Sequence, residues 1–406
     1  MTPKKFFTFV ALITAAAVIA LVLFHRLNTE HPGGAPGAST TASAPKLKWT
    51  FKPDNNSAVA SIVIGKDGTI FAGANNGIYA IAPDGTRQWK TQIAGLLYLA
   101  GSDEGTLYVA SSYGLIFSVL SNGTLSWKPG QGLIGFGGPP AIGKNGYVFF
   151  ANTVSDLFAF RPGSSTSPDW SQGTFREGIV NVNSSLPGEA RVGGAQSRNT
   201  PAIWRDETMA LPRQHWIHLF YPDGSSPWFS ELTPGQLGPA ALADDGTIYV
   251  ADDRRTFFAV RRSGDTLWQF TTDGMVMGSA VVGADNTIYF ATSNSVYALT
   301  PEGSLKWQIK APQQATTAPA LADDGTVYVG GATGFFAIRS DGSLKWTLRT
   351  MSATGAPTIA ADGTIYYPCG YQWVCALQDE GSPLAKSPWP KMYHDPANTS
   401  RILTVF

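Results

Sequence analysis

Residues 285–307, DNTIYFATSNSVYALTPEGSLKW, contain the pattern that decides the fold. A turn at Asp285-Asn286-Thr287 leads into a strand-like stretch, a short loop leads to Val-Tyr-Ala-Leu, and a second turn at Glu302-Gly303 precedes a stretch ending in Lys-Trp. Asp-Gly and Asn-Gly pairs supply the positive φ that tight antiparallel turns need, and Tyr, Val, Ile and Phe suit half-buried strands. The stretch therefore predicts short strands joined by tight turns.

The same pattern recurs along the chain from Lys46 onward. Its first turn starts at eight positions, separated by 37, 41, 61, 39, 40, 39 and 38 residues: Asp67, Glu104, Asn145, Asp206, Asp245, Asp285, Asp324 and Asp362. Two turns and one loop in about 40 residues predict a four-stranded propeller blade. We therefore expect an all-β, eight-bladed propeller with antiparallel blades, and the one long interval predicts an insertion. Because the copy at Asp206-Glu207-Thr208 is degenerate, seven blades are the alternative.

Tryptophan residues indicate how the ring closes. Seven units end in a Trp: Trp89, Trp127, Trp170, Trp228, Trp268, Trp307 and Trp346. The eighth unit breaks into prolines after Gly381, whereas residues 47–50, Leu-Lys-Trp-Thr, have no unit before them. We therefore expect the N-terminal strand to complete the last blade, so that no sheet edge is left open. The tryptophans are expected to be structural wedges between blades.

Residues 297–307, and the copies at 79–89 and 336–346, resemble the repeat of propellers related to pyrroloquinoline quinone (PQQ) dehydrogenases. The resemblance covers residues 46–406 and includes the ending WPKMYHDPANT at residues 389–399. Enzymes of this family hold PQQ on Ca²⁺ with carboxylates, an aspartate base and a disulfide between adjacent cysteines. This chain has no adjacent cysteines, and its Ala298–Trp307 spacing is one residue shorter than the docking motif of those enzymes. We therefore expect no cofactor, and a PQQ- and Ca²⁺-dependent dehydrogenase is the alternative.

The N-terminal residues predict a membrane anchor. Lys4 and Lys5 precede nineteen uncharged residues, Phe6 to Phe24, which as a helix would be about 28 Å long, close to the thickness of a bilayer core. Residues 1–27 are therefore expected to be a transmembrane helix, with a cleaved signal peptide as the alternative. Residues 28–45, rich in Gly, Pro, Ser and Thr, predict a flexible linker to the propeller at 46–406. The lysines favour an inside N-terminus, which places the propeller outside the cytoplasm.

The chain has 29 basic and 29 acidic residues, and only 14% of its residues are charged. This balance gives no basic face for nucleic acid, so no nucleic-acid partner is expected. His215 and His218 form H-x-x-H, but on a strand this pattern favours polar residues at a blade edge over a metal site. The two cysteines, Cys369 and Cys375, flank a loop of the last blade, and outside the cytoplasm they favour a disulfide over two buried thiols.

Both turns of every unit fall on one face of the predicted disc. The opposite, variable face consists of the loops between second and third strands and the connections between blades. On it we place an insertion at 171–198 and nine candidate partner-binding residues: Arg176, Arg191, Arg198, Arg213, His215, Arg254, Arg255, Tyr371 and Trp373. Arg and aromatic residues on loops are common interface anchors, and solvated loop residues are the alternative. The sequence thus predicts a membrane-tethered scaffold that binds a protein or an envelope component.

Overall fold

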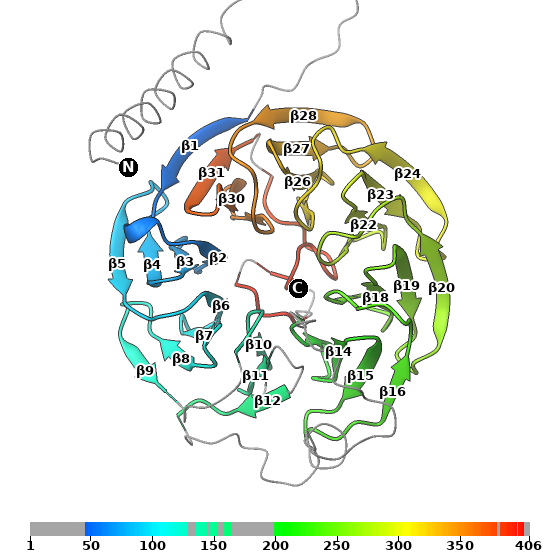
Figure 1. Cartoon of the computed structure of the whole chain (residues 1–406), viewed down its shortest axis with the longest axis horizontal. Helices are drawn as coiled ribbons and strands as arrows, with labels where there is room; N and C mark the ends of the chain where they lie inside the picture. Colours follow the sequence, from blue (N-terminus) through cyan, green and yellow to red (C-terminus); the bar gives the residue numbers. More distant parts are fainter. Residues whose placement is uncertain are drawn as a thin grey trace, which may run out of the picture. The chain divides into compact units, whose positions relative to one another are not determined.

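The strands of this computed structural model form eight antiparallel sheets around one axis (Figure 1). The structure describes residues 45–128, 135–144, 146–152, 157–163, 199–379, 382–395 and 397–401. The predicted insertion, Trp170, residues 1–27 and most of the linker lie outside the described residues. Eight sheets confirm the eight-bladed interpretation, and the alternative of seven blades is wrong because the degenerate unit at 206–208 forms a blade of its own.

The first four blades follow the chain. Blade 1 consists of β2 (Val59–Ile64), β3 (Ile70–Ala74), β4 (Gly77–Ile81) and β5 (Arg87–Thr91). Blade 2 consists of β6 (Leu97–Gly101), β7 (Leu107–Ser111), β8 (Ile116–Val119) and β9 (Leu125–Trp127). Blade 3 has three strands in the described residues: β10 (Ala141–Ile142), β11 (Val148–Ala151) and β12 (Leu157–Phe160). Blade 4 consists of β13 (Ala202–Ile203), β14 (Met209–Arg213), β15 (Trp216–Phe220) and β16 (Trp228–Glu231).

The last four blades repeat this order. Blade 5 consists of β17 (Ala241–Leu242), β18 (Ile248–Ala251), β19 (Thr256–Val260) and β20 (Thr266–Thr271). Blade 6 consists of β21 (Val281–Val282), β22 (Ile288–Ala291), β23 (Ser295–Leu299) and β24 (Leu305–Lys310). Blade 7 consists of β25 (Ala320–Leu321), β26 (Val327–Gly331), β27 (Gly334–Ile338) and β28 (Leu344–Arg349). Blade 8 consists of β29 (Thr358–Ile359), β30 (Thr364–Cys369), β31 (Trp373–Gln378) and the N-terminal β1 (Lys46–Phe51).

The closure by β1 is confirmed. β1 pairs antiparallel with β31, with Trp49 opposite Ala376 and Phe51 opposite Val374. A short 3₁₀ helix, η1 (Asp54–Asn56), then leads into blade 1. Because the first and last parts of the chain share one sheet, the ring is held shut by backbone hydrogen bonds.

In six blades the first turn is held by the side chain of its own aspartate, and in blade 2 the Thr106 N–H donates instead to Ser102 Oγ (3.2 Å). In blade 6 the Asp285 carboxylate accepts hydrogen bonds from the backbone N–H of Thr287 (3.0 Å) and from its hydroxyl (2.6 Å). Where the turn lacks glycine, Glu207 and Asn286 adopt φ values of 67° and 60°. The degenerate copy therefore keeps the turn geometry of the repeat.

The tryptophans join neighbouring blades, as expected. The indole N–H of Trp307 donates to the carbonyl oxygen of Ser340 at 2.8 Å, and its ring covers Gly342 in the second turn of blade 7. A Cβ on Gly342 would lie 2.8 Å from that ring. The same indole bond recurs at four other blade boundaries, from Trp49, Trp89, Trp228 and Trp268 to Pro83, Ser121, Arg262 and Pro301. The repeated glycine therefore makes room for the preceding blade.

The boundary between blades 7 and 8 is built differently, because β1 replaces a continuous fourth strand. Here the buried carboxylate of Asp379 accepts a hydrogen bond from the Tyr328 hydroxyl (2.7 Å) and pairs with the Lys345 ammonium (3.0 Å). The Lys345 side chain is itself buried. A buried polar cluster thus joins blade 7 to the end of β31 in blade 8.

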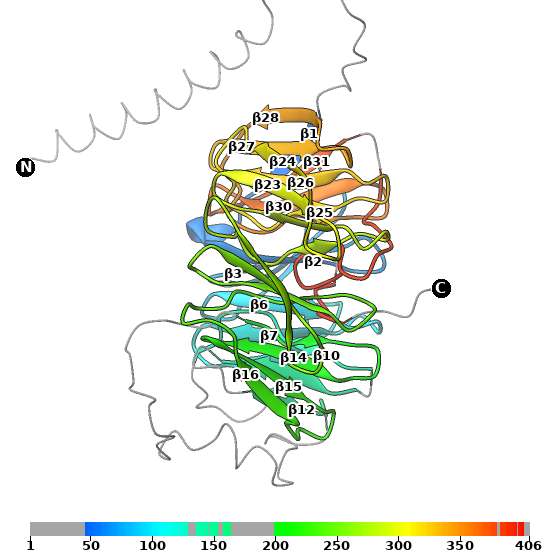
Figure 2. The ribbon, with the colours of Figure 1, turned by 90° about the vertical axis from the view of Figure 1, so that its right-hand side faces the viewer.

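The C-terminal segment, residues 382–401, enters the ring on its axis, where it is drawn red in Figures 1 and 2. Its backbone bonds to the inner strands of several blades, for example from Leu321 N–H to Pro390 O (2.8 Å) and from Ile203 N–H to Ser400 O (2.8 Å). All these contacts lie at strand ends next to first turns. The segment therefore fills the axis on the side of the ring that carries the turns.

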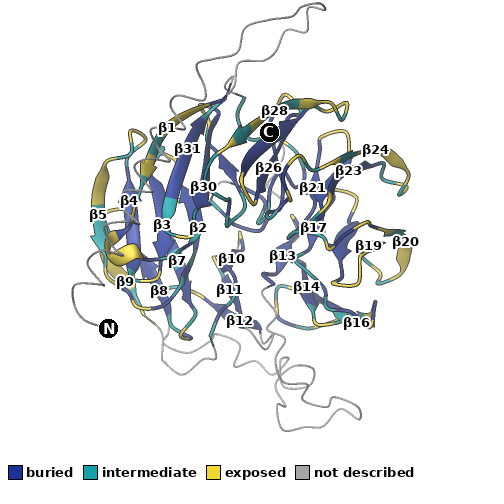
Figure 3. Ribbon diagram, turned by 45° about the horizontal axis from the view of Figure 1, so that its top comes forward, coloured by how far each residue is buried: buried dark blue, intermediate teal, exposed yellow. Residues whose placement is uncertain are grey.

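Burial decreases outward in the blades whose outer strand is described. The middle strands are buried, whereas the outer strands β5, β20 and β24 consist of exposed and partly buried residues (Figure 3). The buried clusters extend across blade boundaries; Val59 and Tyr79 of blade 1 pack with Tyr366 and Val374 of blade 8. The rigid ring therefore supports two faces, which we call the turn face and the variable face.

Candidate functional site on the variable face

A cleft of about 220 Å³ lies on the variable face where blades 4, 5 and 6 meet. Its walls come from the chain before the inner strands of these blades, at Asn199, at 236–239 and at 275–278, and from the loops at Gln214 and 251–253. Equivalent positions of three blades thus converge on one hollow beside the axis.

Hydrogen bonds fix the walls of the cleft. The Asn199 side-chain N–H group donates to the carbonyl oxygens of Pro212 and Leu237, both at 3.0 Å. The buried carboxylate of Asp252 accepts hydrogen bonds from the backbone N–H groups of Arg254 (2.9 Å) and Thr256 (2.8 Å). Because these groups are committed to holding the loops, the side chains presented to a ligand are those of the exposed Gln214 and Met275.

The acidic residues at the cleft also serve its loops. The Thr233 hydroxyl donates to Asp252 Oδ2 at 2.6 Å, and the Gln236 backbone N–H donates to Asp253 Oδ1 at 2.9 Å. Among the described residues, no group of three His, Cys, Asp or Glu side chains is placed to hold a metal ion. The cleft thus combines loop-bound polar groups with an apolar wall at Leu237, Pro239 and Val276.

Four of the nine predicted residues lie next to residues of this cleft in the sequence, but do not line it themselves. Arg213 is the last residue of β14, not a loop residue as predicted, because the β14–β15 pairing extends to Arg213 and Trp216. His215 lies in the following loop, and Arg254 and Arg255 lie between β18 and β19. Arg176, Arg191 and Arg198 lie outside the described residues.

His215 and His218 have different surroundings. His215 is at a loop, whereas His218 lies on β15 with its ring stacked on Phe220 (5.9 Å between centroids) and on Phe229 (5.4 Å). Burial, aided by the charge of Arg213, lowers the pKa of His218 to about 3. His218 is therefore a neutral member of an aromatic stack.

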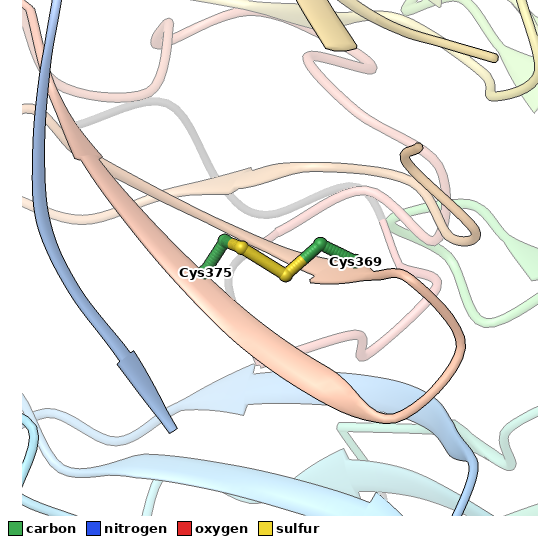
Figure 4. The surroundings of a disulfide bond; sticks show 2 residues. All are labelled: Cys369 and Cys375. Carbon is green, nitrogen blue, oxygen red and sulfur yellow. A yellow bond between two sulfur atoms is a disulfide. The ribbon is translucent and has the colours of Figure 1, made fainter. Parts of the chain in front are cut away.

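The disulfide joins Cys369 on β30 to Cys375 on β31 (Figure 4). The two Cα atoms are 6.0 Å apart, and both residues are fully buried. Only residues 370–372 form the turn, so Trp373, predicted in a loop, is the first residue of β31. Tyr371 and Trp373 lie on blade 8, and the structure does not bring them together with the arginines of blades 4 and 5.

Some residues of this face were missed by the sequence interpretation. Gln214, Gln236 and Met275 at the cleft, and Tyr113 on blade 2, are neither charged nor next to a cysteine. One signal in the sequence points to the cleft. A pair of glycines precedes the inner strand in two successive units, as Gly-x-x-Gly at 235–238 and as Gly-x-x-x-Gly at 274–278.

The part of the chain that the structure describes contains no helix long and apolar enough to cross a membrane.

Comparisons with known proteins agree with this architecture. The family model described as outer membrane protein assembly factor BamB matches residues 259–391, about a third of the chain. No curated protein sequence matches the chain.

Three solved structures have a similar fold. BamB from Moraxella catarrhalis is 14% identical, with a TM-score of 0.64, and the alignment covers 83% of this chain and 98% of that one. The computationally designed Ika8 protein is 11% identical, with a TM-score of 0.64 and coverage of 81% and 98%. A catalytically inactive virginiamycin B lyase from Staphylococcus aureus, solved with quinupristin, is 13% identical, with a TM-score of 0.53 and coverage of 82% and 99%. The resemblance to PQQ-like propellers is therefore confirmed by the BamB model over residues 259–391, and the ring as a whole shares the fold of these structures.

Proposed function

We propose that this protein is a membrane-tethered, extracytoplasmic scaffold that binds another protein or an envelope component through its variable face. The observation that carries this proposal is the contrast between the faces. The turn face repeats one hydrogen-bonded turn, whereas the variable face carries different loops in each blade and a cleft where three blades meet. Binding residues are disproportionately found on such loops, held by a rigid scaffold.

The connection to the anchor supports the same assignment. β1 is the fourth strand of its blade, so it starts at the turn face, and the linker joins the propeller there at Lys46. The variable face is therefore not the one from which the chain leaves toward the predicted transmembrane segment at Phe6–Phe24. The assembly-factor description of the matching family model supports a binding role as well.

We propose in addition that the chain works without PQQ. The described residues do not fit a PQQ–Ca²⁺ site: Trp389, Lys391 and His394 fill the axis on the turn side and are buried there. At the other mouth, the carboxylates of Asp252 and Asp253 already bind loop N–H groups and Thr233. The disulfide links a hairpin, not adjacent residues.

Capture from detergent-solubilised membranes tests the scaffold. The full-length chain is compared with a variant that carries Met275→Asp and Tyr371→Asp, which place charges at two separate exposed positions of the variable face. Leu344→Asp on the outer strand β28 is the control; the three side chains are 49%, 70% and 40% exposed. We expect a reproducible partner that the variable-face variant loses and Leu344→Asp retains. The absence of any reproducible partner would contradict the scaffold.

A second assay addresses the alternative. The purified full-length protein is incubated with PQQ and Ca²⁺, and reduction of a redox dye is followed with alcohols and sugars. We expect no reduction above the protein-free rate. Substrate-dependent dye reduction would replace the scaffold by a dehydrogenase.

A further inference from the structure

Two tyrosines dominate a second region of the variable face. Tyr371 is 70% exposed and Tyr113 is 69% exposed, more than any other large hydrophobic side chain among the described residues. Tyr371 lies between the second and third strands of blade 8, and Tyr113 between those of blade 2. Blade 1 lies between them in the ring (Figure 1).

The loops around these tyrosines share a composition. They are Asn55-Asn56-Ser57, Asn75-Asn76-Gly77, Ser111-Ser112-Tyr113-Gly114 and Gly370-Tyr371-Gln372, which we call the tyrosine sector. Tyr, Ser, Gly and Asn are the residues enriched in antibody loops that bind proteins. Tyr offers a large, rigid contact area with a polar tip, and Asn and Ser offer adaptable donors and acceptors.

Backbone hydrogen bonds tie the sector together across three blades. Val59 N–H donates to Tyr371 O (2.9 Å), Asn75 N–H to Ala58 O (3.0 Å), and Gly95 N–H to Asn75 O (3.2 Å). The path continues from Ser112 N–H to Leu96 O (2.9 Å), next to Tyr113. The loops of Tyr371 and Asn75 are thus fixed to the following blade, and the other two bonds hold loops within blades 1 and 2. This fixing lowers the entropy that a partner must remove on binding.

Local geometry also holds the two rings. A Cβ on Gly95 would lie 3.0 Å from Cδ2 of Tyr113, so the ring lies close to this glycine. Tyr371 has a φ of 65°, a left-handed conformation that is costly for an aromatic residue, directly after Gly370 at 54°. The disulfide joins the two strands below this turn. A strained tyrosine that is exposed gains nothing for the core, which favours a role in binding.

The four loops of the sector contain no charged residue. Beside them, the Asp54 carboxylate pairs with Arg87 (3.1 Å) and Lys90 (3.3 Å), and the Lys52 ammonium lies 5.1 Å from the centroid of the Trp373 ring. By contrast, the chain beside the cleft carries Arg213 at the end of β14 and Asp253, Arg254 and Arg255 in one loop. The two regions therefore suit different surfaces.

We infer that the tyrosine sector is the main protein-docking surface of this chain, and that its partner presents an uncharged, hydrogen-bonding protein surface. This inference rests on the proposed scaffold function and makes it specific. Association is expected to depend weakly on salt, because the four loops of the sector carry no charge.

The test uses the full-length protein in its native membranes. A photo-crosslinking residue, p-benzoylphenylalanine, replaces Tyr371 in one sample and Arg254 in another, and crosslinked proteins are identified by mass spectrometry. The protein crosslinked at 371 is then purified, and its Kd is measured at low and high NaCl. Three variants are compared: Tyr113→Ala with Tyr371→Ala, Arg254→Ala with Arg255→Asn, and Tyr221→Ala as a tyrosine control on the turn face, 45% exposed.

We expect the double tyrosine variant to weaken binding by about 30-fold or more, since clustered tyrosine anchors carry much of an interface's energy. The arginine variant and Tyr221→Ala should change the Kd by less than about threefold, as should salt. Unchanged thermal unfolding of the tyrosine variant shows that the loss is not unfolding.

Crosslinking at 254 but not at 371 would overturn the inference and leave the scaffold function standing. So would a Kd lost in the arginine variant, or crosslinking at 371 only to a glycan. No crosslinked protein at either position would overturn both.

Discussion

The two faces of this propeller grow from the same strands but are stabilised in different ways. On the turn face, Asp67, Asp206 and Asp285 each bind the Thr two residues later, so one solution is repeated from blade to blade. On the variable face, Asp252 holds the loop of blade 5 through N–H groups, whereas a disulfide supports the loop of blade 8. Changes on the turn face should therefore cost stability, and changes on the variable face should cost binding.

The largest effect is expected at Lys391, in the segment that fills the axis. Its buried ammonium donates to Met392 O (2.8 Å), Asp395 O (3.1 Å) and Asn398 Oδ1 (2.6 Å), and burial lowers its pKa to about 7, against the opposing effect of the Asp395 charge. Lys391→Met leaves three buried oxygens without this donor. The substitution also removes the free-energy cost of burying the amine, which offsets part of that loss. The free energy of unfolding should therefore fall by about 3 kcal/mol.

Denaturant unfolding measures this loss, with Lys306→Met as the control. Lys306 forms a 3.4 Å pair with Asp285 at the surface and is 39% exposed, so its replacement should cost less than about 1 kcal/mol. Equal losses in the two variants would mean that the C-terminal segment does not brace the ring. Partner binding by folded Lys391→Met should be unchanged.

The next effect separates blade docking from turn strain. Gly342→Ala places a Cβ 2.8 Å from the Trp307 ring at a φ of 87°, whereas Gly163→Ala, at a φ of 86°, meets no atom of the described residues within 4 Å. The first should cost about 2–3 kcal/mol and the second about 1 kcal/mol, because both pay the left-handed conformation but only one disrupts a blade contact. Similar melting temperatures for the two variants would show that the Trp–Gly contact adds nothing.

The blades could be predicted because each is a local pattern. Asp-Gly turns and the spacing to Trp307 depend on residues within one unit. The strand at 47–50, which has no unit before it, fits the fourth strand that the eighth unit lacks. The position of residues 389–399 could not be predicted, because Trp389 and Ser400 bond to backbone groups of inner strands rather than to side chains with a sequence signature.

The site was less predictable than the fold. Their charge makes Arg213 and Arg254 candidates from the sequence, but the cleft between them is lined by Gln214, Gln236 and Met275, which come together only when three blades meet. Tyr113 carries no motif, and its relation to Tyr371 depends on a hydrogen-bond path across blade 1. Local patterns contain no information about such contacts between blades.

A smaller effect is expected from the disulfide of the variable face. Cys369→Ser with Cys375→Ser should cost about 2 kcal/mol, since the chain between the cysteines is short and the entropic gain falls with loop length. The melting temperature should drop by a few degrees while the ring stays folded, as circular dichroism can show. If the mutant protein binds the partner as tightly as the wild type, the disulfide supports only the hairpin and not the tyrosine sector.

The smallest effect concerns His218 and acid. The pKa of His218 in the folded protein, about 3, lies below its ordinary value of about 6.5. Between these values the His218 side chain is protonated in the unfolded chain and neutral in the folded protein. The stability contributed by the neutral ring is present above pH 6.5 and is lost progressively as the pH falls toward 3, amounting to about 1 kcal/mol between pH 7 and 5.5. His218→Phe keeps an aromatic ring between Phe220 and Phe229 and should remove this part of the pH dependence.

Urea unfolding of both proteins at pH 7 and pH 5.5 measures this difference in pH dependence, in which any constant packing change cancels. Above pH 5 the carboxylates are ionised in both states, so parallel losses in the two proteins would mean that His218 takes up its proton in the folded ring.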